Sequence, residues 1–461
     1  MRRFALVLVS GVVAFAVLAG GCSRKAMKLP PERQLTFDTR VNHDLDNNDN
    51  FSPDSKWLVY DTRNPNGIAV TRSIQKVNVE TGEIVTLYSP ADTNQYGPGV
   101  GAASYHPFEP EVVFIHGPLH PSKRLSYQFW RRTGAMIDER QPGKIFWLDA
   151  RDVTPPFTPG ALRGGTHRHE WSGDGNWIGF TYNDQIMKRL GDRLGKDLNL
   201  RTIGVARAGH PVRVDHDAAG ENRDGLWFSV LVVKVVPDPA PGSDEISRAS
   251  GDSWVGEHGY RKPDGTLQRA RGFIGKVRDA RGEPVDEVFV VDIPEDIETP
   301  SPEGPLEGTE TTFPTPPLGC KQRRLTHTAE TRFPGCRGNV RSAPDGSRLS
   351  YLARDSLGVW QVFLISPNGG TPEQLTHGRV NVQSEARWDP TGRWVAFARN
   401  NAVVVASVQR DDSFGKTRVL TDPALGTPSN LVWSRDGKLI AFNRDVDGVQ
   451  QIFVVPFDGK L

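Results

Sequence analysis

The chain has 461 residues, 37% of them hydrophobic, with 56 basic against 55 acidic side chains and a formal net charge of +1. A near-neutral chain gives no general electrostatic reason to expect nucleic-acid binding. Beyond a short apolar stretch near its start, the sequence has no apolar run of the roughly 18 residues that a membrane-spanning helix needs.

Residues 1–21 are expected to be a signal peptide that lies outside the folded domain. An apolar stretch over residues 4–18 is followed by Ala-Gly-Gly-Cys, ending at Cys22, which resembles the lipobox of bacterial lipoproteins. That resemblance implies cleavage before Cys22 and lipidation of its thiol and new amine. The protein would then be held in the cell envelope, at the periplasmic face of the outer membrane in a Gram-negative organism. An ordinary secretory signal is the alternative, and residues 22–32 are expected to be a linker.

From residue 33 onward, the sequence repeats a pattern of four short strands. Each repeat has a turn rich in Pro, Asp and Gly, two apolar runs and a closing Leu-Thr pair, as at Leu325, Leu375 and Leu420. Repeats of about 40 residues with four strands each are typical of a β-propeller. We therefore predict an all-β fold, with residues 33–461 forming a single propeller of seven four-stranded blades. Six blades is the alternative.

The ring is predicted to close through its N-terminal segment. The last repeat reaches Leu461 without a closing Leu-Thr pair, whereas Leu35 and Thr36 stand at the start with no repeat before them. A propeller protects its strand edges when such a segment completes the last blade. Leu35 should therefore lie beside the strand at residues 452–455.

The fourth repeat is irregular. Residues 228–233 are the expected inner strand of blade four, and insertions are expected at residues 237–272 and 294–319. Loops of this length are usually functional or disordered. Trp254, Glu257 and His258 in the first insertion are therefore candidates for binding a ligand over the channel mouth. A solvated flap is the alternative.

Cys320 and Cys336 are the only cysteines after Cys22. Paired thiols of an exported chain tend to oxidise in the compartment that they enter. A disulfide between Cys320 and Cys336 would tie the end of one blade to the start of the next. Two buried free thiols are the alternative, because sequence spacing does not establish the required Cα approach.

Several stretches resemble a known family. The Pro-Asp-Gly turns and Leu-Thr strands resemble TolB-type propeller repeats. More specific similarity to the YidR-type family of bacterial proteins lies at residues 115–118 (IHGP), 162–169 (LRGGTHRH), 180–184 (FTYND), 241–246 (PGSDEI) and 308–312 (GTETT). The resemblance covers nearly all residues after the signal and implies a TolB-like propeller, without any activity to carry over. The lipobox is a departure from the enterobacterial form and puts a cytoplasmic role in doubt.

His167 and His169 form the sharpest local signal for chemistry. Side chains alternate along a strand, so both imidazoles are expected on one face, which in a propeller can line the channel. Two histidines can bind Zn²⁺, Mn²⁺ or Fe²⁺ if a further ligand is present, and the candidates are His116, His258 and Asp49. The pair also resembles the channel histidines of oligogalacturonate lyases, which are metal-using propellers. Metal-free, hydrogen-bonded histidines are the alternative.

The sequence contains no nucleophile elbow, P-loop or dinucleotide-binding fingerprint. Trp130, Trp147 and Trp254 fall outside the repeat register and are candidates for stacking on a ligand. We therefore expect a monomeric, lipid-anchored envelope propeller that binds a carbohydrate or an envelope protein and no nucleic acid. A metal-dependent polysaccharide lyase or hydrolase, with His167 and His169 as metal ligands, is the alternative, so enzymatic activity stays open.

Overall fold

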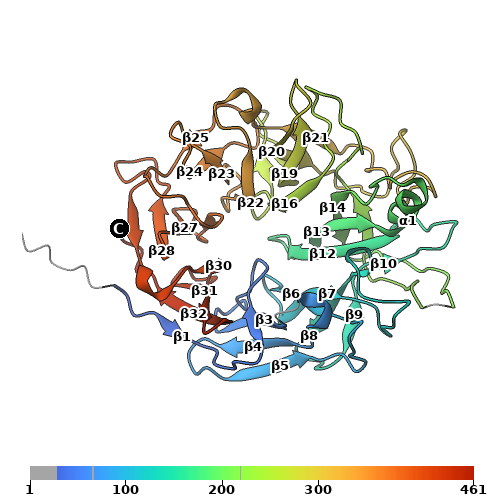
Figure 1. The fold of residues 1–461 in the computed structure, drawn as a ribbon, viewed down its shortest axis with the longest axis horizontal. Helices are drawn as coiled ribbons and strands as arrows, with labels where there is room; N and C mark the ends of the chain where they lie inside the picture. The colour runs from blue at the N-terminus through green and yellow to red at the C-terminus, as the bar shows by residue number, and fades with distance from the viewer. Residues whose placement is uncertain (1–28, 65–66, 219) are drawn as a thin grey trace, which may run out of the picture.

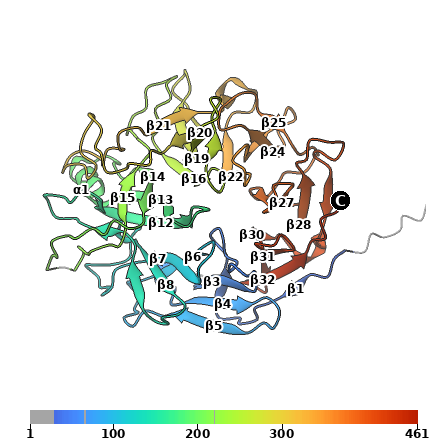
Figure 2. The same ribbon diagram turned by 180° about the vertical axis from the view of Figure 1, so that it is seen from behind.

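The computed structural model describes residues 29–64, 67–218 and 220–461, which form a ring of seven antiparallel four-stranded sheets (Figure 1). The sheets are arranged radially around a central channel, and the same ring is seen from behind in Figure 2. The predicted all-β, seven-bladed propeller is therefore confirmed, and the six-bladed alternative is wrong. The predicted signal peptide and Cys22 lie outside the described residues.

The four strands of each blade follow one another from the channel outward. Blades one to three are β2 (Asn42–Asp44), β3 (Trp57–Arg63), β4 (Ile74–Asn78) and β5 (Ile84–Tyr88); β6 (Val100–Tyr105), β7 (Glu111–His116), β8 (Thr133–Asp138) and β9 (Ile145–Trp147); β12 (Gly164–Trp171), β13 (Trp177–Asp184), β14 (Arg201–Arg207) and β15 (Phe228–Leu231). Blades four and five are β16 (Ala249–Trp254), β19 (Ala270–Arg278), β20 (Pro284–Asp292) and β21 (Lys321–Arg324); β22 (Cys336–Ser342), β23 (Leu349–Arg354), β24 (Trp360–Ile365) and β25 (Glu373–Gln374). Blades six and seven are β26 (Arg387–Trp388), β27 (Trp394–Arg399), β28 (Ala402–Ser407) and β29 (Thr417–Val419); β30 (Ser429–Trp433), β31 (Leu439–Val446), β32 (Val449–Pro456) and β1 (Arg33–Gln34).

The N-terminal strand β1 closes the ring as predicted. It pairs antiparallel with β32 at the outer edge of blade seven, with Arg33 opposite Val454 and Gln34 opposite Phe453. Blade seven is therefore built from both ends of the described chain, and the backbone groups on the outer edge of β32 find partners in β1.

The recurring Leu-Thr pair has a structural cause. In blade four, Leu325 donates its N–H to the carbonyl of Val288, and the Thr326 hydroxyl accepts the N–H of Val288, both at 2.8 Å. The leucine is buried, and the threonine side chain continues the ladder where the backbone of the outer strand turns away. The same pair of bonds is made in blades five, six and seven by Leu375 and Thr376, Leu420 and Thr421, and Leu35 and Thr36.

Blade four differs from the expectation. Residues 228–231 form β15, the outer strand of blade three, so their assignment as the inner strand of blade four is wrong. The inner strand of blade four is β16, which lies within residues 237–272, the range expected to be an insertion. Its sequence, Ala-Ser-Gly-Asp-Ser-Trp, is mostly small and polar because an inner strand borders the channel rather than the core. Hydrophobic periodicity therefore gives no signal for it.

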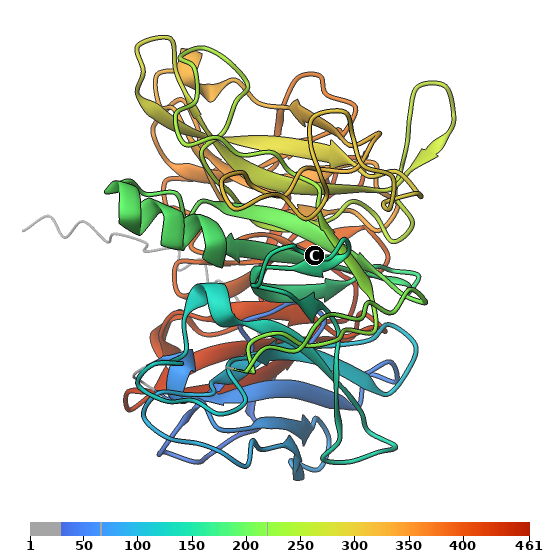
Figure 3. The same cartoon turned by 90° about the vertical axis from the view of Figure 1, so that its right-hand side faces the viewer.

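The remaining elements decorate the ring. Helix α1 (Gln185–Leu194) stands outside the sheets, as Figure 3 shows, and begins where the Asp184 side chain accepts the N–H of Met187. Two-stranded pairs are formed by β10 (Ala150–Arg151) with β11 (Ala161–Leu162) and by β17 (Tyr260–Arg261) with β18 (Leu267–Gln268). Among the described residues, no helix has the length and apolar character required to cross a bilayer.

The predicted disulfide is not formed. Both Cys320 and Cys336 are free thiols. Cys336 is buried in the core, where its sulfur lies 3.6 Å from the Thr326 hydroxyl, whereas Cys320 is partly buried and packs against a different hydrophobic cluster. Burial raises the pKa of Cys320 to about 12, so its thiol stays protonated at neutral pH. Protonated thiols are poor nucleophiles for disulfide exchange.

Candidate functional site

A cavity of about 490 Å³ occupies one mouth of the central channel. Residues from all seven blades line it, at the level where the inner strands end and the Pro-Asp-Gly turns begin. We call this end of the channel the turn mouth. Here the radial arrangement of the blades brings together side chains that are far apart in the sequence.

Glu170, the penultimate residue of β12, is the centre of the charges at the turn mouth. Its carboxylate accepts a 3.0 Å bond from Arg271 and a 2.8 Å bond from Asn48, and lies 3.4 Å from a guanidinium nitrogen of Arg341. Burial raises the pKa of Glu170, and the two guanidinium groups oppose that rise. Buried carboxylates are stable only with such partners, so the geometry fixes Glu170 in position.

Arg271 reaches Glu170 because of a glycine. A Cβ at Gly179 would lie 1.8 Å from a guanidinium nitrogen of Arg271, so the neighbouring strand must have no side chain there. The same guanidinium also contacts Asp252 and lies over the ring of Trp254, 4.8 Å from the centroid. The arginine therefore joins blade three to blade four behind the cavity wall.

A second acidic group supports the wall at blade six. Glu385 lies 2.9 Å from Arg387 and 3.8 Å from Arg341. Burial alone would raise the pKa of Glu385, but these two arginines outweigh it and lower the pKa to about 2. Burial and the neighbouring Arg387 lower the pKa of Arg341 to about 9. Carboxylates and guanidinium groups therefore alternate around this side of the turn mouth.

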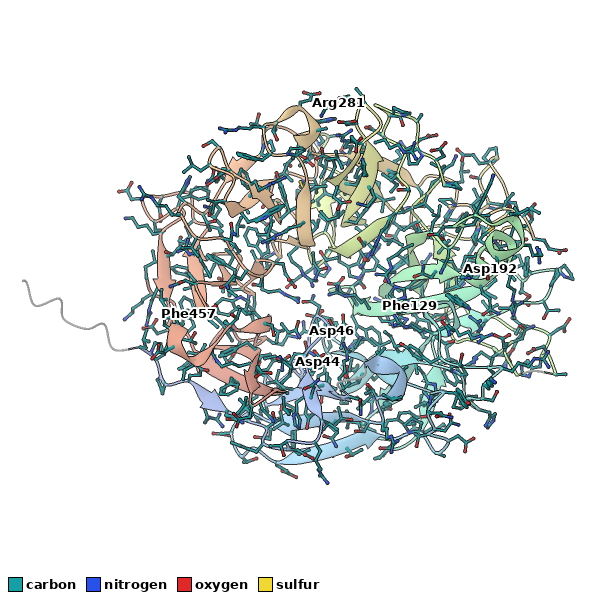
Figure 4. All side chains as sticks on the ribbon, viewed as in Figure 1. Asp44, Asp46, Phe129, Asp192, Arg281 and Phe457 are labelled. Carbon is teal, nitrogen blue, oxygen red and sulfur yellow. The ribbon has the colours of Figure 1, made fainter. Side chains whose placement is uncertain are left out.

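A segment between β2 and β3 crosses the channel and ties distant blades together. Asn47 donates to the carbonyls of Ala102 and His169, at 2.9 and 2.8 Å, and Asn48 bonds both Glu170 and Arg387. Figure 4 shows Asp46, in the same segment, near the centre of the ring. Asp49 follows and forms an ion pair with Arg435 of blade seven at 3.4 Å. The segment therefore forms part of the cavity wall.

Several donors in the wall make no hydrogen bond. They are buried nitrogens, and the described residues provide no acceptor for Trp171 Nε1, Arg341 Nε, Arg387 Nε or Arg435 Nε. These orphan groups of the cavity wall are all donors, and a bound ligand would have to offer acceptors. An exposed aromatic ring stands beside them, because Phe108 also lines the cavity and is 64% exposed.

Some of the sequence-predicted residues meet in this cavity. Trp254, Glu257 and Asp49 line it, and Trp254 donates its indole N–H to the Glu170 carbonyl at 2.9 Å. His258 is exposed beside Glu257 and is not part of the lining. Of the three tryptophans proposed for stacking, only Trp254 lies at the turn mouth; Trp130 and Trp147 do not line it.

His167 and His169 lie in β12, as predicted, but are buried and do not line the cavity. The strand has a bulge between His167 and Glu170, and Arg168 takes a positive φ of 58°, so strict alternation does not hold there. None of the four ring nitrogens makes a hydrogen bond with the described residues. Asp149 is the nearest acid, 3.9 Å from His169.

The third ligand that a metal would need is not found near this pair. The described part of the chain contains no group of three or more histidine, cysteine or acidic side chains that could hold a metal ion. His116 is instead a structural residue: its ring nitrogens lie 2.7 Å from the Gly117 carbonyl and 3.1 Å from the Tyr88 hydroxyl. Burial lowers the pKa of His116 to about 4.

Sequence reasoning missed Glu170, Arg341, Arg387, Arg435 and Phe108. A signal for three of them exists: Glu170, Arg341 and Arg387 each stand five residues before the glycine of the repeated turn, as the penultimate residue of an inner strand. In these three blades, a charged side chain at that place points into the channel mouth. The sequence does not reveal which of these charges meet, because that depends on the ring.

Comparisons with known proteins find a matching family, a relative in Escherichia coli and several solved structures. Residues 99–222 match the family described as a protein of unknown function, DUF3748. The uncharacterized protein YidR of Escherichia coli is 40% identical over 419 residues, which is 89% of this chain and 94% of that protein. A solved oligogalacturonate lyase in complex with manganese has a TM-score of 0.53 at 12% identity, over 94% of this chain and 99% of the lyase. TolB from Acinetobacter baumannii is 12% identical with a TM-score of 0.35, over 88% of this chain and 64% of TolB.

Proposed function

The chain belongs to the same family as the uncharacterized protein YidR, and we propose that it is a binding module whose ligand occupies the turn-mouth cavity. The observation that carries this proposal is the cavity, about 490 Å³ with walls from all seven blades. Pockets of about 300–1,000 Å³ take small ligands. The volume therefore favours a carbohydrate over an envelope protein as the occupant.

The chemistry of the wall indicates the class of carbohydrate. Arg341, Arg387 and Arg435 present donors without acceptors among the described residues, and guanidinium groups bind carboxylates through paired, charge-assisted bonds. Phe108 offers an exposed ring against which the apolar face of a sugar can pack. A short oligosaccharide that carries carboxylate groups satisfies both features.

We also propose that the protein acts in the cell envelope, held there by a lipid anchor. The sequence Ala-Gly-Gly-Cys ending at Cys22 supports a lipid anchor and a location in the cell envelope. Strand β1 is the outer strand of blade seven, so the chain joins the ring at its rim and away from the channel (Figure 1). An anchor that leads into β1 would leave the turn mouth free for a ligand.

A metal-dependent polysaccharide lyase is the second candidate, and the orphan nitrogens of His167 and His169 are the observation in its favour. The solved lyase with manganese supports the shared fold and no more, at 12% identity. His167 and His169 by themselves do not fit a manganese ion, because the described residues near these two histidines supply no third ligand. Metal analysis of the purified protein and of His167→Ala tests this candidate: stoichiometric metal that is lost in the variant would favour it.

Calorimetric titration with oligogalacturonate and with a neutral galacto-oligosaccharide tests the binding proposal. We expect the wild type to bind the acidic sugar more tightly, and Arg435→Gln to weaken that binding about tenfold through loss of a charge-assisted bond. Phe108→Ala should weaken it as well. Phe37→Ala is the matched control, because Phe37 is 68% exposed and is not part of the cavity wall.

Two outcomes would overturn the proposal. One is the absence of saturable binding of either sugar by the wild type. The other is equal binding by Phe108→Ala and Phe37→Ala together with unchanged binding by Arg435→Gln, since the ligand would then lie elsewhere.

A further inference from the structure

Arginines from adjacent blades collect at the opposite end of the channel, which we call the second mouth. Strands β12 and β16 both end in the wall of the turn-mouth cavity, at Trp171 and Trp254, so both begin at the second mouth. Arg248 immediately precedes β16. Arg201 is the first residue of β14, which runs parallel to β12 because both strands pair antiparallel with β13. The two arginines therefore lie at the same end of the ring.

Arg132 of blade two joins them. The Arg132 carbonyl accepts the N–H of Thr166 at 3.2 Å, which places Arg132 beside the beginning of β12. The 3-10 turn η2 (Phe129–Arg131) lies directly over Gly165, where a Cβ would come within 2.0 Å of the Phe129 carbonyl oxygen. The Arg132 guanidinium lies over the half-exposed ring of Phe129, 4.6 Å from its centroid. Figure 4 shows Phe129 beside the inner strands of blade three.

These three arginines have no counter-ion of their own in the described part of the chain. Two acidic side chains act on them electrostatically, Asp252 on Arg201 and Asp46 on Arg132. Both are already engaged, Asp252 with Arg271 and Asp46 with Arg63 at 2.7 Å. Burial and the neighbouring guanidinium groups, Arg248 first, lower the pKa of Arg201 to about 10. Like charges therefore repel one another across the second mouth.

A fully buried side chain without hydrogen bonds adjoins the cluster. His167 follows Thr166, the residue bonded to Arg132, and both of its ring nitrogens lack partners among the described residues. Burial, and then the guanidinium groups of Arg132 and Arg201, hold the pKa of His167 well below its ordinary value. The ring is therefore neutral and has an N–H free to donate.

We propose that the second mouth binds a multiply charged oxyanion, through phosphate or carboxylate groups, between Arg132, Arg201 and Arg248. Such an anion replaces the mutual repulsion of the guanidinium groups by charge-assisted hydrogen bonds, the strongest kind that arginine forms. The exposed face of Phe129 supplies an apolar border for the organic part of the ligand. This site is separate from the turn-mouth cavity, and it stands whether or not a sugar binds there.

Calorimetric titration of the whole protein with inorganic phosphate and with citrate, at constant low ionic strength, tests the site. Binding should be saturable with one site per chain, and the better of the two probes identifies the anionic group. Arg201→Gln should weaken the binding about tenfold, as expected for loss of one charged hydrogen-bonding partner. Arg248→Gln, which changes an exposed side chain and leaves the core intact, should weaken it by a smaller factor.

Arg207→Gln is the matched control. This variant removes a positive charge from the same strand, β14, but at the end opposite to Arg201. The variant should therefore bind the anion as tightly as the wild type does. The proposal is overturned if neither probe binds saturably to the wild type. It is also overturned if Arg207→Gln weakens binding as much as Arg201→Gln, because the effect would then reflect net charge rather than a site.

Discussion

Leu35 donates its backbone N–H to the carbonyl oxygen of Ile452 at 2.8 Å, so residues near the two ends of the described chain share one sheet. The next residue strengthens the junction: the Thr36 hydroxyl donates to Gln451 Oε1 at 2.7 Å and accepts the N–H of Ile452 at 2.9 Å. All of these groups are buried. The stability of the ring therefore depends on a few residues that precede the first blade.

Thr36→Ala should destabilise the propeller by about 1–3 kcal/mol, because it leaves the N–H of Ile452 and the side-chain amide oxygen of Gln451 buried without their partner. The midpoint of urea unfolding measures the change. Deletion of residues 33–37 should lower the melting temperature further, since it exposes the whole edge of β32. Phe37→Ala, at an exposed side chain, should change little. An unchanged unfolding midpoint in Thr36→Ala would contradict the closure.

Glu170→Ala should cost about 3–5 kcal/mol of unfolding free energy, because it leaves Arg271 buried beside Asp252 without its second partner. The loss is expected to appear in urea unfolding at neutral pH. Glu257→Ala, at an exposed position of the same cavity, should be within experimental error of the wild type. Equal stability of the two variants would show that the charges of the turn mouth do not support the fold.

The two buried histidines of β12 should each contribute a loss of stability as the pH is lowered below about 6.5, the ordinary pKa of histidine. Burial lowers the pKa of His169 to about 3 and holds that of His167 well below its usual range. The two imidazoles bind protons below pH 6.5 in the unfolded chain but not in the folded chain. His169, with its folded pKa of about 3, therefore removes about 2 kcal/mol of stability by pH 5. The raised pKa of Asp149, about 7 through burial, acts in the opposite direction.

Comparison with a variant isolates the histidine contribution. Between pH 7 and pH 5, the wild type should lose about 2 kcal/mol more than His169→Gln, measured by urea unfolding at each pH. His258→Gln is the control and should keep the wild-type dependence, because His258 is exposed. Parallel pH profiles of the wild type and His169→Gln would contradict the burial of a neutral ring.

Cys320 and Cys336 should both react with a thiol reagent after the protein is purified without reductant and unfolded. The reason is that the two thiols are free, with one of them deep in the core. Counting thiols in denaturant before and after reduction is the measurement. A count that rises by two on reduction would show that the disulfide predicted from the sequence does form.

Cys22→Ala should release the protein from membranes into the soluble envelope fraction or stall its processing. The proposed lipoprotein carries more than one acyl chain, and two such signals are sufficient for stable anchoring whereas a single chain binds only reversibly. Immunoblots of separated membrane and soluble fractions are the readout. Ser23→Ala, beside the same motif, is the control, and full membrane retention of Cys22→Ala would refute the lipid anchor.

The sequence by itself determined the propeller and the closing strand, and it favoured seven blades over six. The blades depend on local signals: turn residues, apolar runs and the Leu-Thr pair act within one blade, where the interacting residues are mostly neighbours along the chain. The closing strand is a long-range contact, but it was recognisable because the same local Leu-Thr signal stands alone at the start of the repeats. The prediction that residues 228–233 form the inner strand of blade four was wrong because it relied on an apolar run alone. The true inner strand, β16, borders the channel and therefore lacks the apolar pattern that marked the others.

Only the tertiary structure decided which side chains meet in the channel. Glu170, Arg341 and Asn48 come from three blades and are distant in sequence, so no periodicity brings them together. The bulge that separates His167 from Glu170, the glycine that admits Arg271 and the three arginines of the second mouth likewise depend on contacts between strands. Ring closure places these groups at two ends of one channel, because every inner strand begins at one mouth and ends at the other.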